Sequence, residues 1–406
     1  MNKITLLTKT ERKLVNNYRN LVYKDTLSKL VFIIGIFATR ERKINFKELG
    51  NSEIEIGGTK YLNDLKLVGR KKILNGIFTL KKKFSTVNDI EYSRINRKTS
   101  YKKSFQVLTS SSSDLITLYN HLDSLLFKKL TSRELKKALR QLDGKFKSMQ
   151  DKEILGFIFD YPYFFHQAGT NENYFGIELA KALDTNVCVY CNREYISTIT
   201  NVNGKKIISP AFDHFLSQKE FPYLAISLFN LIPSCYSCNS QLKYEEEFNL
   251  SQYLYPYEAC YEGLALFSAS LKKSLLAKCI PSEIININDI EISLESKTIK
   301  KDIRIFGNPS LPINKIKGNL NVFQTNYIYN TIHKDSVHEI ITKFRVHSKK
   351  DIESLRTSYS FIKSESDVYN FYFHNYLNEN DFNKRPLSRM TRDIAKQLEK
   401  IYGINF

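Results

Sequence analysis

Two Cys-x-x-Cys pairs, Cys188 with Cys191 and Cys235 with Cys238, limit what this chain of 406 residues can fold into more than any other feature. Each pair has the spacing of a zinc knuckle, and four thiolates suit a tetrahedral zinc ion at about 2.3 Å. A thioredoxin-like redox motif would need only one pair, and disulfides are rare in a reducing compartment. We therefore predict that all four cysteines bind one structural zinc ion.

The segment between the two pairs is too long for a simple zinc ribbon. It holds 43 residues, against about 15–20 in a ribbon, so the sequence predicts an inserted element. Two β-prone runs, 194–200 and 205–212, flank Asn201-Val202-Asn203-Gly204, a turn sequence typical of a hairpin. The second run leads into Asp213-His214, and the residues after Cys238 are compatible with a helix.

Four polar residues in and after this insert have side chains suited to hydrolytic chemistry. The Asp213 carboxylate and the Asn239 amide oxygen are hard ligands of the kind that Mg²⁺ or Mn²⁺ prefers. The imidazole of His214, with an ordinary pKa of about 6.5, can take a proton from water near neutral pH. Asn230 can bridge backbone groups and so orient the loop that carries His214. A zinc ion held by both knuckles would fix Asp213 against Asn239.

The motif as a whole resembles the HNH endonuclease family, which has a ββα-metal fold and one catalytic divalent ion. The resemblance is carried by Cys188-x-x-Cys191, Asp213-His214, Phe229-Asn230-Leu231 and Pro233-Ser234-Cys235-x-x-Cys238-Asn239. It implies that His214 is the general base, that Asp213 and Asn239 bind the catalytic ion, and that Asn230 orients the loop. The last motif position is Asn239 rather than histidine, a substitution found in the family. The motif spans about 60 residues, roughly a seventh of the chain.

A wider similarity extends beyond the motif. It rests on Leu179-Ala180-Lys181-Ala182-Leu183, Asp213-His214-Phe215-Leu216, Phe323-Gln324-x-Asn326-Tyr327 and Arg392-Asp393-Ile394-Ala395-Lys396-Gln397-Leu398. These segments are similar to the large prokaryotic HNH proteins of Septu-type and retron-linked antiviral systems. That similarity implies a role in antiviral defence beside an SMC-like ATPase partner subunit.

The net charge of the chain is concentrated at one end. Residues 1–150 hold 32 Lys and Arg against 13 Asp and Glu, and residues 151–406 hold 29 of each, so the first 150 residues carry all of the formal +19. A genome-wide bias toward lysine would affect both parts alike. A one-sided basic region indicates a polyanionic partner, and we expect it to be nucleic acid. The alternatives are an anionic membrane surface, contact between residues 1–110 and a partner protein, and a solvated helical face without a partner.

Four regions follow from the local patterns, and they predict an α+β fold. Residues 1–110 form the basic region, with a helix from residue 9 to about 40 and then β-prone runs around Gly57-Gly58. Residues 111–184 show helical periodicity, 185–260 hold the HNH module with its four-Cys zinc site, and 261–406 change from β-prone to helical. The central ββα-metal module is thus expected to lie within mostly helical flanking regions.

Membrane spanning is not expected from this sequence. The longest apolar run, residues 30–38, has nine residues, whereas about 20 are needed to cross a bilayer. The first residues lack the apolar length and the small-residue cleavage site of a signal peptide. We therefore expect a cytoplasmic protein with reduced thiols.

Three functions are compatible with these features. The first is a metal-dependent HNH nuclease that cuts DNA, with the basic region bound to the phosphate backbone. The second is an RNA-cleaving HNH nuclease, because the choice between DNA and RNA depends on groove shape and on contacts with the 2′-hydroxyl. The third is a catalytically inert zinc-dependent nucleic-acid-binding module. The complete set of Asp213, His214, Asn230 and Asn239 favours a nuclease.

Overall fold

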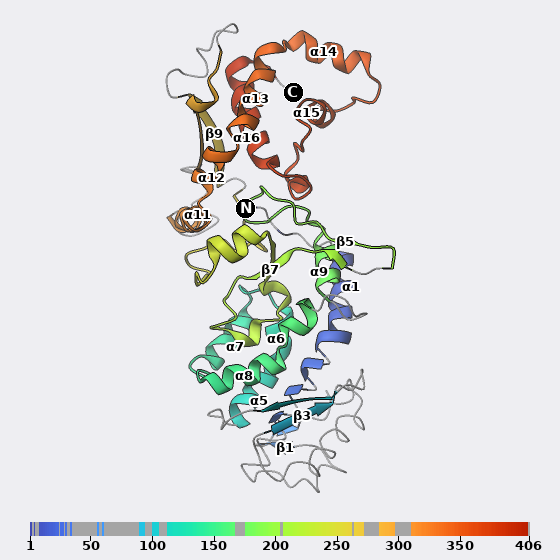
Figure 1. The fold of residues 1–406 in the computed structure, drawn as a ribbon, viewed down its shortest axis with the longest axis vertical. Helices are drawn as coiled ribbons and strands as arrows, with labels where there is room; N and C mark the ends of the chain where they lie inside the picture. The colour runs from blue at the N-terminus through green and yellow to red at the C-terminus, as the bar shows by residue number, and fades with distance from the viewer. Residues whose placement is uncertain are drawn as a thin grey trace. The chain divides into compact units, whose positions relative to one another are not determined.

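The computed structural model describes most of the chain from residue 112 onward and shorter stretches before it (Figure 1). The described residues are 1, 4, 8–23, 25–27, 29–30, 33–34, 55–56, 59–60, 89–93, 100–104, 112–166, 175–203, 206–261, 264–271, 284–296 and 310–404. They form two compact units. One comprises Met1–Thr5, Leu183–Phe215 and Ile232–Phe406, and the other comprises Leu6–Ala182 and Leu216–Leu231. We call them the cysteine unit and the helical unit.

Within the described residues the fold is a mostly helical α+β arrangement with small two-stranded sheets. This confirms the coarse fold class predicted from the sequence. No described helix is both long enough and apolar enough to span a membrane.

The helical unit is built mainly from short helices. Their bounds are α1 Thr8–Tyr18, η1 Arg19–Tyr23, α5 Ser112–Asn120, α6 Leu122–Phe127, α7 Arg133–Leu142, α8 Met149–Ile158, η3 Pro162–His166, α9 Phe175–Leu183, η4 Pro222–Leu224 and η5 Leu228–Asn230. Serine caps begin two of them, since the Ser132 and Ser148 hydroxyls accept hydrogen bonds from backbone N–H groups in the first turns of α7 and α8.

An aromatic cluster lies in the core of the helical unit. The Tyr18 ring at the end of α1 packs edge-on against Phe127 of α6 and Phe175 of α9, with ring centroids 5.3 and 4.8 Å away. The Tyr18 hydroxyl also donates a hydrogen bond to the carbonyl oxygen of Ile226. This bond ties α1 to the segment Leu216–Leu231, which belongs to this unit although it follows Leu183–Phe215 of the cysteine unit in the chain.

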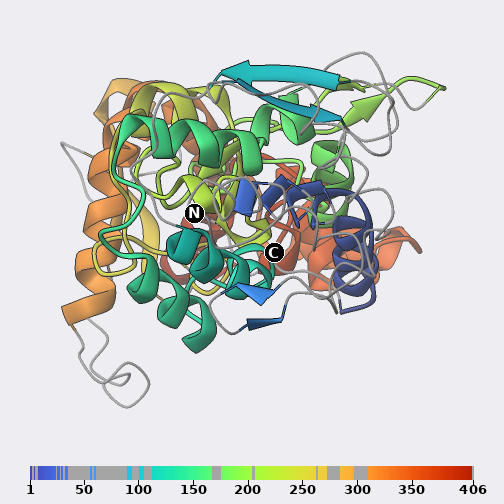
Figure 2. The ribbon, with the colours of Figure 1, turned by 90° about the horizontal axis from the view of Figure 1, so that it is seen from below.

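Among the described residues before 112, two small antiparallel sheets are present. One pairs β1 (Glu55–Ile56) with β2 (Thr59–Lys60), on either side of Gly57-Gly58, and the other pairs β3 (Asp89–Ser93) with β4 (Ser100–Ser104). The second sheet is the pair of cyan arrows at the top of Figure 2. The sequence predicted short paired strands here, and the β-prone run at residues 73–80 lies outside the described residues.

The cysteine unit carries the remaining strands and the C-terminal helices. The strands are β5 Ile199–Thr200, β6 Lys206–Ile208, β7 Ala211–His214, β8 Leu231–Ser234, β9 Ala265–Leu271 and β10 Ile290–Ser296. The helical segments are η6 Ser237–Lys243, η8 Ile287–Asp289, α11 Ser310–Val322, α12 Thr325–Ile332, α13 Lys334–Val346, α14 Lys349–Ser358, α15 Glu365–Phe373, η9 Glu379–Asp381 and α16 Ser388–Tyr402.

Strands β9 and β10 form an antiparallel pair whose outer edges are covered by helix side chains. Asn326 and Asn330 of α12 accept hydrogen bonds from backbone N–H groups of β10 at 2.7 and 2.9 Å. Asp393 and Gln397 of α16 accept from those of β9 at 3.1 and 2.9 Å. Because these amide and carboxylate groups satisfy the strand backbone, neither edge is left open for further pairing.

The β-branched residues in 281–310 predict strands there, and β10 forms in this segment, beginning at Ile290 after the single helical turn Ile287–Asp289. Another strand prediction needs correction. The strand expected to run unbroken into Asp213-His214 is divided into β6 and β7 at Ser209-Pro210. Proline has no N–H to donate to a strand partner, so pairing stops there and resumes with a different strand.

Candidate metal centre and the adjoining Asp-His strand

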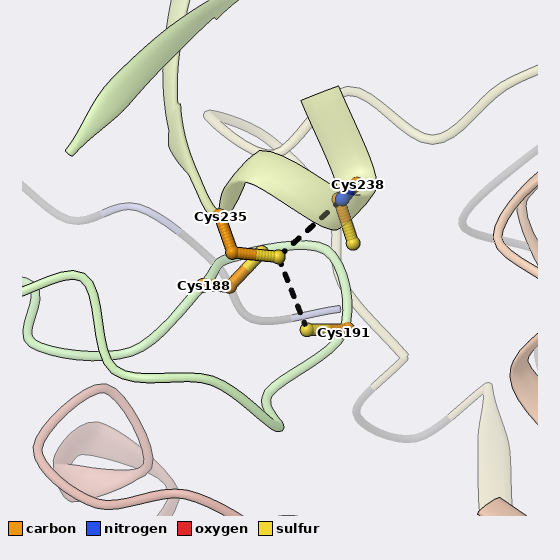
Figure 3. A group of neighbouring side chains, drawn as sticks. All are labelled: Cys188, Cys191, Cys235 and Cys238. Atoms are coloured by element: carbon orange, nitrogen blue, oxygen red, sulfur yellow. Dashed lines mark hydrogen bonds between the residues drawn. The ribbon is translucent and has the colours of Figure 1, made fainter. Parts of the chain in front are cut away.

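The four cysteines of the two knuckles form one buried cluster in the cysteine unit. The Sγ atoms of Cys188, Cys191, Cys235 and Cys238 lie within 4.8 Å of one another and point toward a common centre (Figure 3). The Sγ atoms of Cys191 and Cys235 are 3.9 Å apart. Tetrahedral zinc with bonds of about 2.3 Å requires sulfur–sulfur distances of about 3.8 Å. The described cysteines are all free thiols, so this cluster fits a structural zinc ion.

The first knuckle is a tight turn closed by its own backbone. Cys188 donates its N–H to Glu194 O at 2.9 Å and accepts at its carbonyl from Asn192 N at the same distance. Asn192 has φ of +51°, the left-handed conformation that asparagine tolerates better than most residues. Its side chain is buried and donates to Phe382 O at 2.8 Å. This turn brings the Sγ atoms of Cys188 and Cys191 into the same cluster.

The second knuckle opens the helical segment η6. Cys238 N–H donates to Cys235 Sγ at 3.4 Å, and Asn239 N–H donates to Cys235 O at 3.0 Å. A backbone hydrogen bond from Val189 N to Pro233 O joins the two knuckles. The cluster therefore connects a loop, the end of β8 and the start of a helix.

The thiols differ in their affinity for protons. Burial raises the pKa of Cys188 well above its usual range, since a thiolate there would lose its hydration. Hydrogen bonds from the other three thiols, reinforced by the backbone N–H of Arg193, hold the pKa of Cys191 well below it. Zinc binding requires all four side chains as thiolates, so it would release the protons that these thiols hold.

Strand β7 carries the Asp213-His214 pair and belongs to the same local structure. It pairs with β8, which runs directly into Cys235. The last residue of η6, Lys243, reaches back to this pair. Two paired strands and a helix therefore meet beside the cysteine cluster, in the order β7, β8 and η6.

Asp213 is buried in a network that links the two knuckles. Lys243 Nζ lies 2.7 Å from Oδ1 and 2.9 Å from Oδ2 of the carboxylate, and the Tyr190 hydroxyl donates to Oδ2 at 2.6 Å. Both charged side chains are only 5% exposed. Burial, and then the Asp213 charge, raise the pKa of Tyr190 well above its usual range, so its hydroxyl stays a donor. Tyr190 comes from the first knuckle and Lys243 from the helix that begins at the second.

His214 is half-buried and follows Asp213 in β7. Successive side chains of a strand point to opposite faces, so His214 faces away from the buried carboxylate. Its backbone carbonyl accepts a hydrogen bond from Lys243 Nζ at 2.6 Å. Asn239 is also half-buried, and it lies four residues before Lys243 on η6, roughly one helical turn away.

Asn230 belongs to the helical unit and is fully buried. Its Oδ1 accepts from Leu216 N at 2.8 Å, and its Nδ2 donates to Leu216 O at 3.0 Å and to Leu224 O at 3.2 Å. Leu216 comes two residues after His214 in the chain. The side chain thus ties down the backbone that leaves the Asp-His strand, and its role in orienting His214 stays a prediction.

No sequence motif points to Lys243 or Tyr190 as a partner of Asp213. The residues around Lys243 predict only a helix, and lysine is almost never fully buried unless it is paired. Its position one turn after Asn239 is the signal that could have placed it near Asp213. Tyr190 stands between the first two cysteines, where a zinc knuckle requires no particular residue.

Comparison of the sequence and the structure with known proteins identifies no relative of this chain. No protein-family profile matches the chain, and no similar protein was found among curated proteins or among solved structures. The functional assignment therefore depends on the motif and on its geometry.

Whether Asp213 can bind a divalent ion depends on which acceptor positions of its two carboxylate oxygens are already occupied. A carboxylate oxygen has two acceptor positions. Within the described residues Oδ2 accepts from both Tyr190 and Lys243, whereas Oδ1 accepts from Lys243 alone. One acceptor position on Oδ1 therefore has no hydrogen-bond partner among the described residues, and the binding of a divalent ion by Asp213 and Asn239 stays a prediction.

Proposed function

We propose that this chain is a metal-dependent HNH endonuclease that hydrolyses phosphodiester bonds of nucleic acid, with DNA as its substrate. One observation carries the proposal. The Asp213-His214 strand pairs with the strand that enters the second knuckle, and Lys243 at the end of the following helix contacts both residues. A strand pair followed by a helix beside a four-cysteine cluster supports the ββα arrangement that the motif implies.

Each residue has a distinct task in this proposal. His214 takes the proton of the attacking water at a ring nitrogen, while Asp213 and Asn239 hold the divalent ion, Mg²⁺ or Mn²⁺. When bound, such an ion supplies positive charge to the scissile phosphate and to the leaving oxygen. The relative positions of β7 and η6 are fixed by the zinc cluster and by the hydrogen bonds of Tyr190 and Lys243 with Asp213. Asn230 restrains the backbone after His214.

The proposal extends from this centre to the rest of the chain. Residues 1–150, which carry the whole net charge, bind the phosphate backbone with little sequence preference. The protein acts in the cytoplasm as an effector of antiviral defence, with an SMC-like ATPase as partner subunit. These parts of the proposal follow from the charge distribution and from the wider similarity of the sequence.

The inert zinc-dependent nucleic-acid-binding module is the second candidate, and one observation favours it. Both oxygens of Asp213 already contact the Lys243 ammonium, so the carboxylate is charge-compensated without a metal ion. A protein of this kind would keep the zinc and the basic region but cut nothing.

A cleavage assay separates these functions. Supercoiled plasmid and a structured RNA are incubated side by side with the zinc-loaded protein and either Mg²⁺ or Mn²⁺. The proposal predicts nicked or linear plasmid that depends on the divalent ion and on His214, with little RNA cleavage. RNA cleavage alone would select the RNA nuclease. Cleavage of neither, even after addition of an ATPase partner, would select the inert module.

A further inference from the structure

Lys243 is a buried ammonium group whose hydrogen bonds go to oxygen atoms of the proposed catalytic strand. Its Nζ lies 2.7 and 2.9 Å from the two oxygens of Asp213 and 2.6 Å from the carbonyl oxygen of His214. An ammonium has three N–H donors, so these three contacts use all of them. The ring of Phe248, with its centroid 4.7 Å from Nζ, covers a further side.

The Asp213 carboxylate oxygens and the His214 carbonyl oxygen form a cation site, which the Lys243 ammonium occupies. A carboxylate and a backbone carbonyl are ligands that a hard divalent ion also prefers. Two cations within a few ångströms repel each other strongly where water is largely excluded, and Lys243 and Asp213 are each only 5% exposed. A divalent ion that binds both oxygens of the Asp213 carboxylate must therefore compete with the Lys243 ammonium for them.

We infer that Lys243 is a built-in counter-ion of Asp213 that competes with the divalent ion and sets the ion concentration at which the site fills. The inference rests on the proposed function, because it takes Asp213 as a metal ligand. Lys243 is a positioning residue here: without the ion it holds Asp213 and the His214 carbonyl in place, and it leaves the carboxylate when the ion binds.

The chain around Lys243 allows such a departure. Lys243 is the last residue of η6, and Tyr244, with φ of +39°, ends the segment. The residues that follow, Glu245, Glu246 and Glu247, are exposed. A four-carbon stem at a helix end can turn toward these carboxylates, so the ammonium need not remain unpaired.

Binding of Mn²⁺ to the zinc-loaded full chain, followed by electron paramagnetic resonance without nucleic acid, tests the inference. Lys243→Met keeps the length of the side chain and removes its charge. If the ion pair is formed in about nine molecules of ten, its removal lowers the apparent Kd for Mn²⁺ roughly tenfold. Lys384→Met is the matched control, because Lys384 also pairs with an aspartate, Asp381 at 2.6 Å, and lies over a ring, that of Tyr376. Its apparent Kd should equal that of the parent.

Asp213→Asn shows whether the gain comes from the carboxylate. Mn²⁺ bound at Asp213 should be lost in this variant, and adding Lys243→Met to it should restore nothing. Any weak Mn²⁺ binding that remains in this variant is assigned to exposed carboxylates elsewhere in the chain. An unchanged or raised Kd in Lys243→Met, or the same gain in the Asp213→Asn background, would overturn the inference.

Folding gives a second readout if Lys243→Met is unstable. Its buried carboxylate then lacks a counter-ion, so Mn²⁺ should raise its melting temperature far more than it raises that of Lys384→Met. Instability that Mn²⁺ does not relieve would mean a purely structural role. Cleavage is scored separately. If Lys243→Met binds Mn²⁺ more tightly but neither the parent nor any variant cleaves nucleic acid, the inference about Lys243 holds and the proposed nuclease function fails. If the parent protein cleaves but Lys243→Met has unchanged Mn²⁺ affinity, the nuclease function holds and the inference fails.

Discussion

At the scale of single residues, the motif side chains differ sharply in what holds them. Asp213 is buried against Lys243 and Tyr190, and Asn230 is buried against three backbone groups of its own unit. His214 and Asn239 are half-buried. The first two are thus built into the fold, while the second two keep surface that a substrate or an ion can reach.

Asn230→Ala should destabilise the helical unit. The substitution leaves Leu216 N, Leu216 O and Leu224 O without their side-chain partner, and each such buried group costs about 1–3 kcal/mol. We expect the free energy of unfolding to fall by about 3 kcal/mol or more, measured by urea denaturation. Asn201→Ala, in the exposed turn of the β5–β6 hairpin, is the control and should change little. Equal stability of the two variants would contradict this account of Asn230.

At the scale of elements, the four-cysteine cluster joins a loop, a strand end and a helix start, and we propose that a zinc ion holds them together. Cys235→Ser should therefore abolish zinc binding and lower the unfolding free energy of the cysteine unit by about 5 kcal/mol or more. Elemental analysis and thermal unfolding measure both effects. Cys260→Ser removes a half-buried cysteine outside the cluster and should keep the zinc. A parent protein without zinc and with normal thermal stability would refute the structural metal site.

Elements with a strong local signal could be predicted from the sequence, and those set by distant contacts could not. The helix from residue 8, the hairpin around Asn201-Val202-Asn203-Gly204 and the C-terminal helices follow their periodicity and turn residues. The cysteine spacing alone predicted the cluster. The pairing of β7 with β8 depends on residues far apart in the chain, so no local pattern records it. For Lys243 the one local signal is its position a helical turn after Asn239, which does not by itself predict that the side chain is buried.

At the scale of the whole molecule, charge and chemistry occupy different parts of the sequence. The first 150 residues carry the net +19, while the cysteines and the Asp-His pair lie after residue 187. Nucleic-acid affinity should therefore fall steeply between about 50 and 200 mM salt, because neutralised phosphates release counterions. Replacing Lys81, Lys82 and Lys83 with glutamine should reduce the salt slope by about 0.9 for each lysine that contacts a phosphate.

The matched control for this prediction lies in the neutral part of the chain. Lys349 and Lys350 are exposed at the start of α14, and glutamine at both positions should leave the slope unchanged. Fluorescence anisotropy with a labelled duplex measures the slopes. A binding constant that is flat with salt would assign the basic region to protein docking instead.

The central claim, that this is an HNH nuclease with His214 as its base, is tested most directly by plasmid nicking with His214→Ala. The variant should keep its zinc content, its melting temperature and its affinity for DNA, because His214 is half-buried and lies outside the cysteine cluster. Its rate of nicking with Mg²⁺ should fall about 10²–10⁴-fold, the usual cost of losing a positioned base. His338→Ala on α13 should nick at the parental rate. Nicking by His214→Ala as fast as by the parent would contradict the claim.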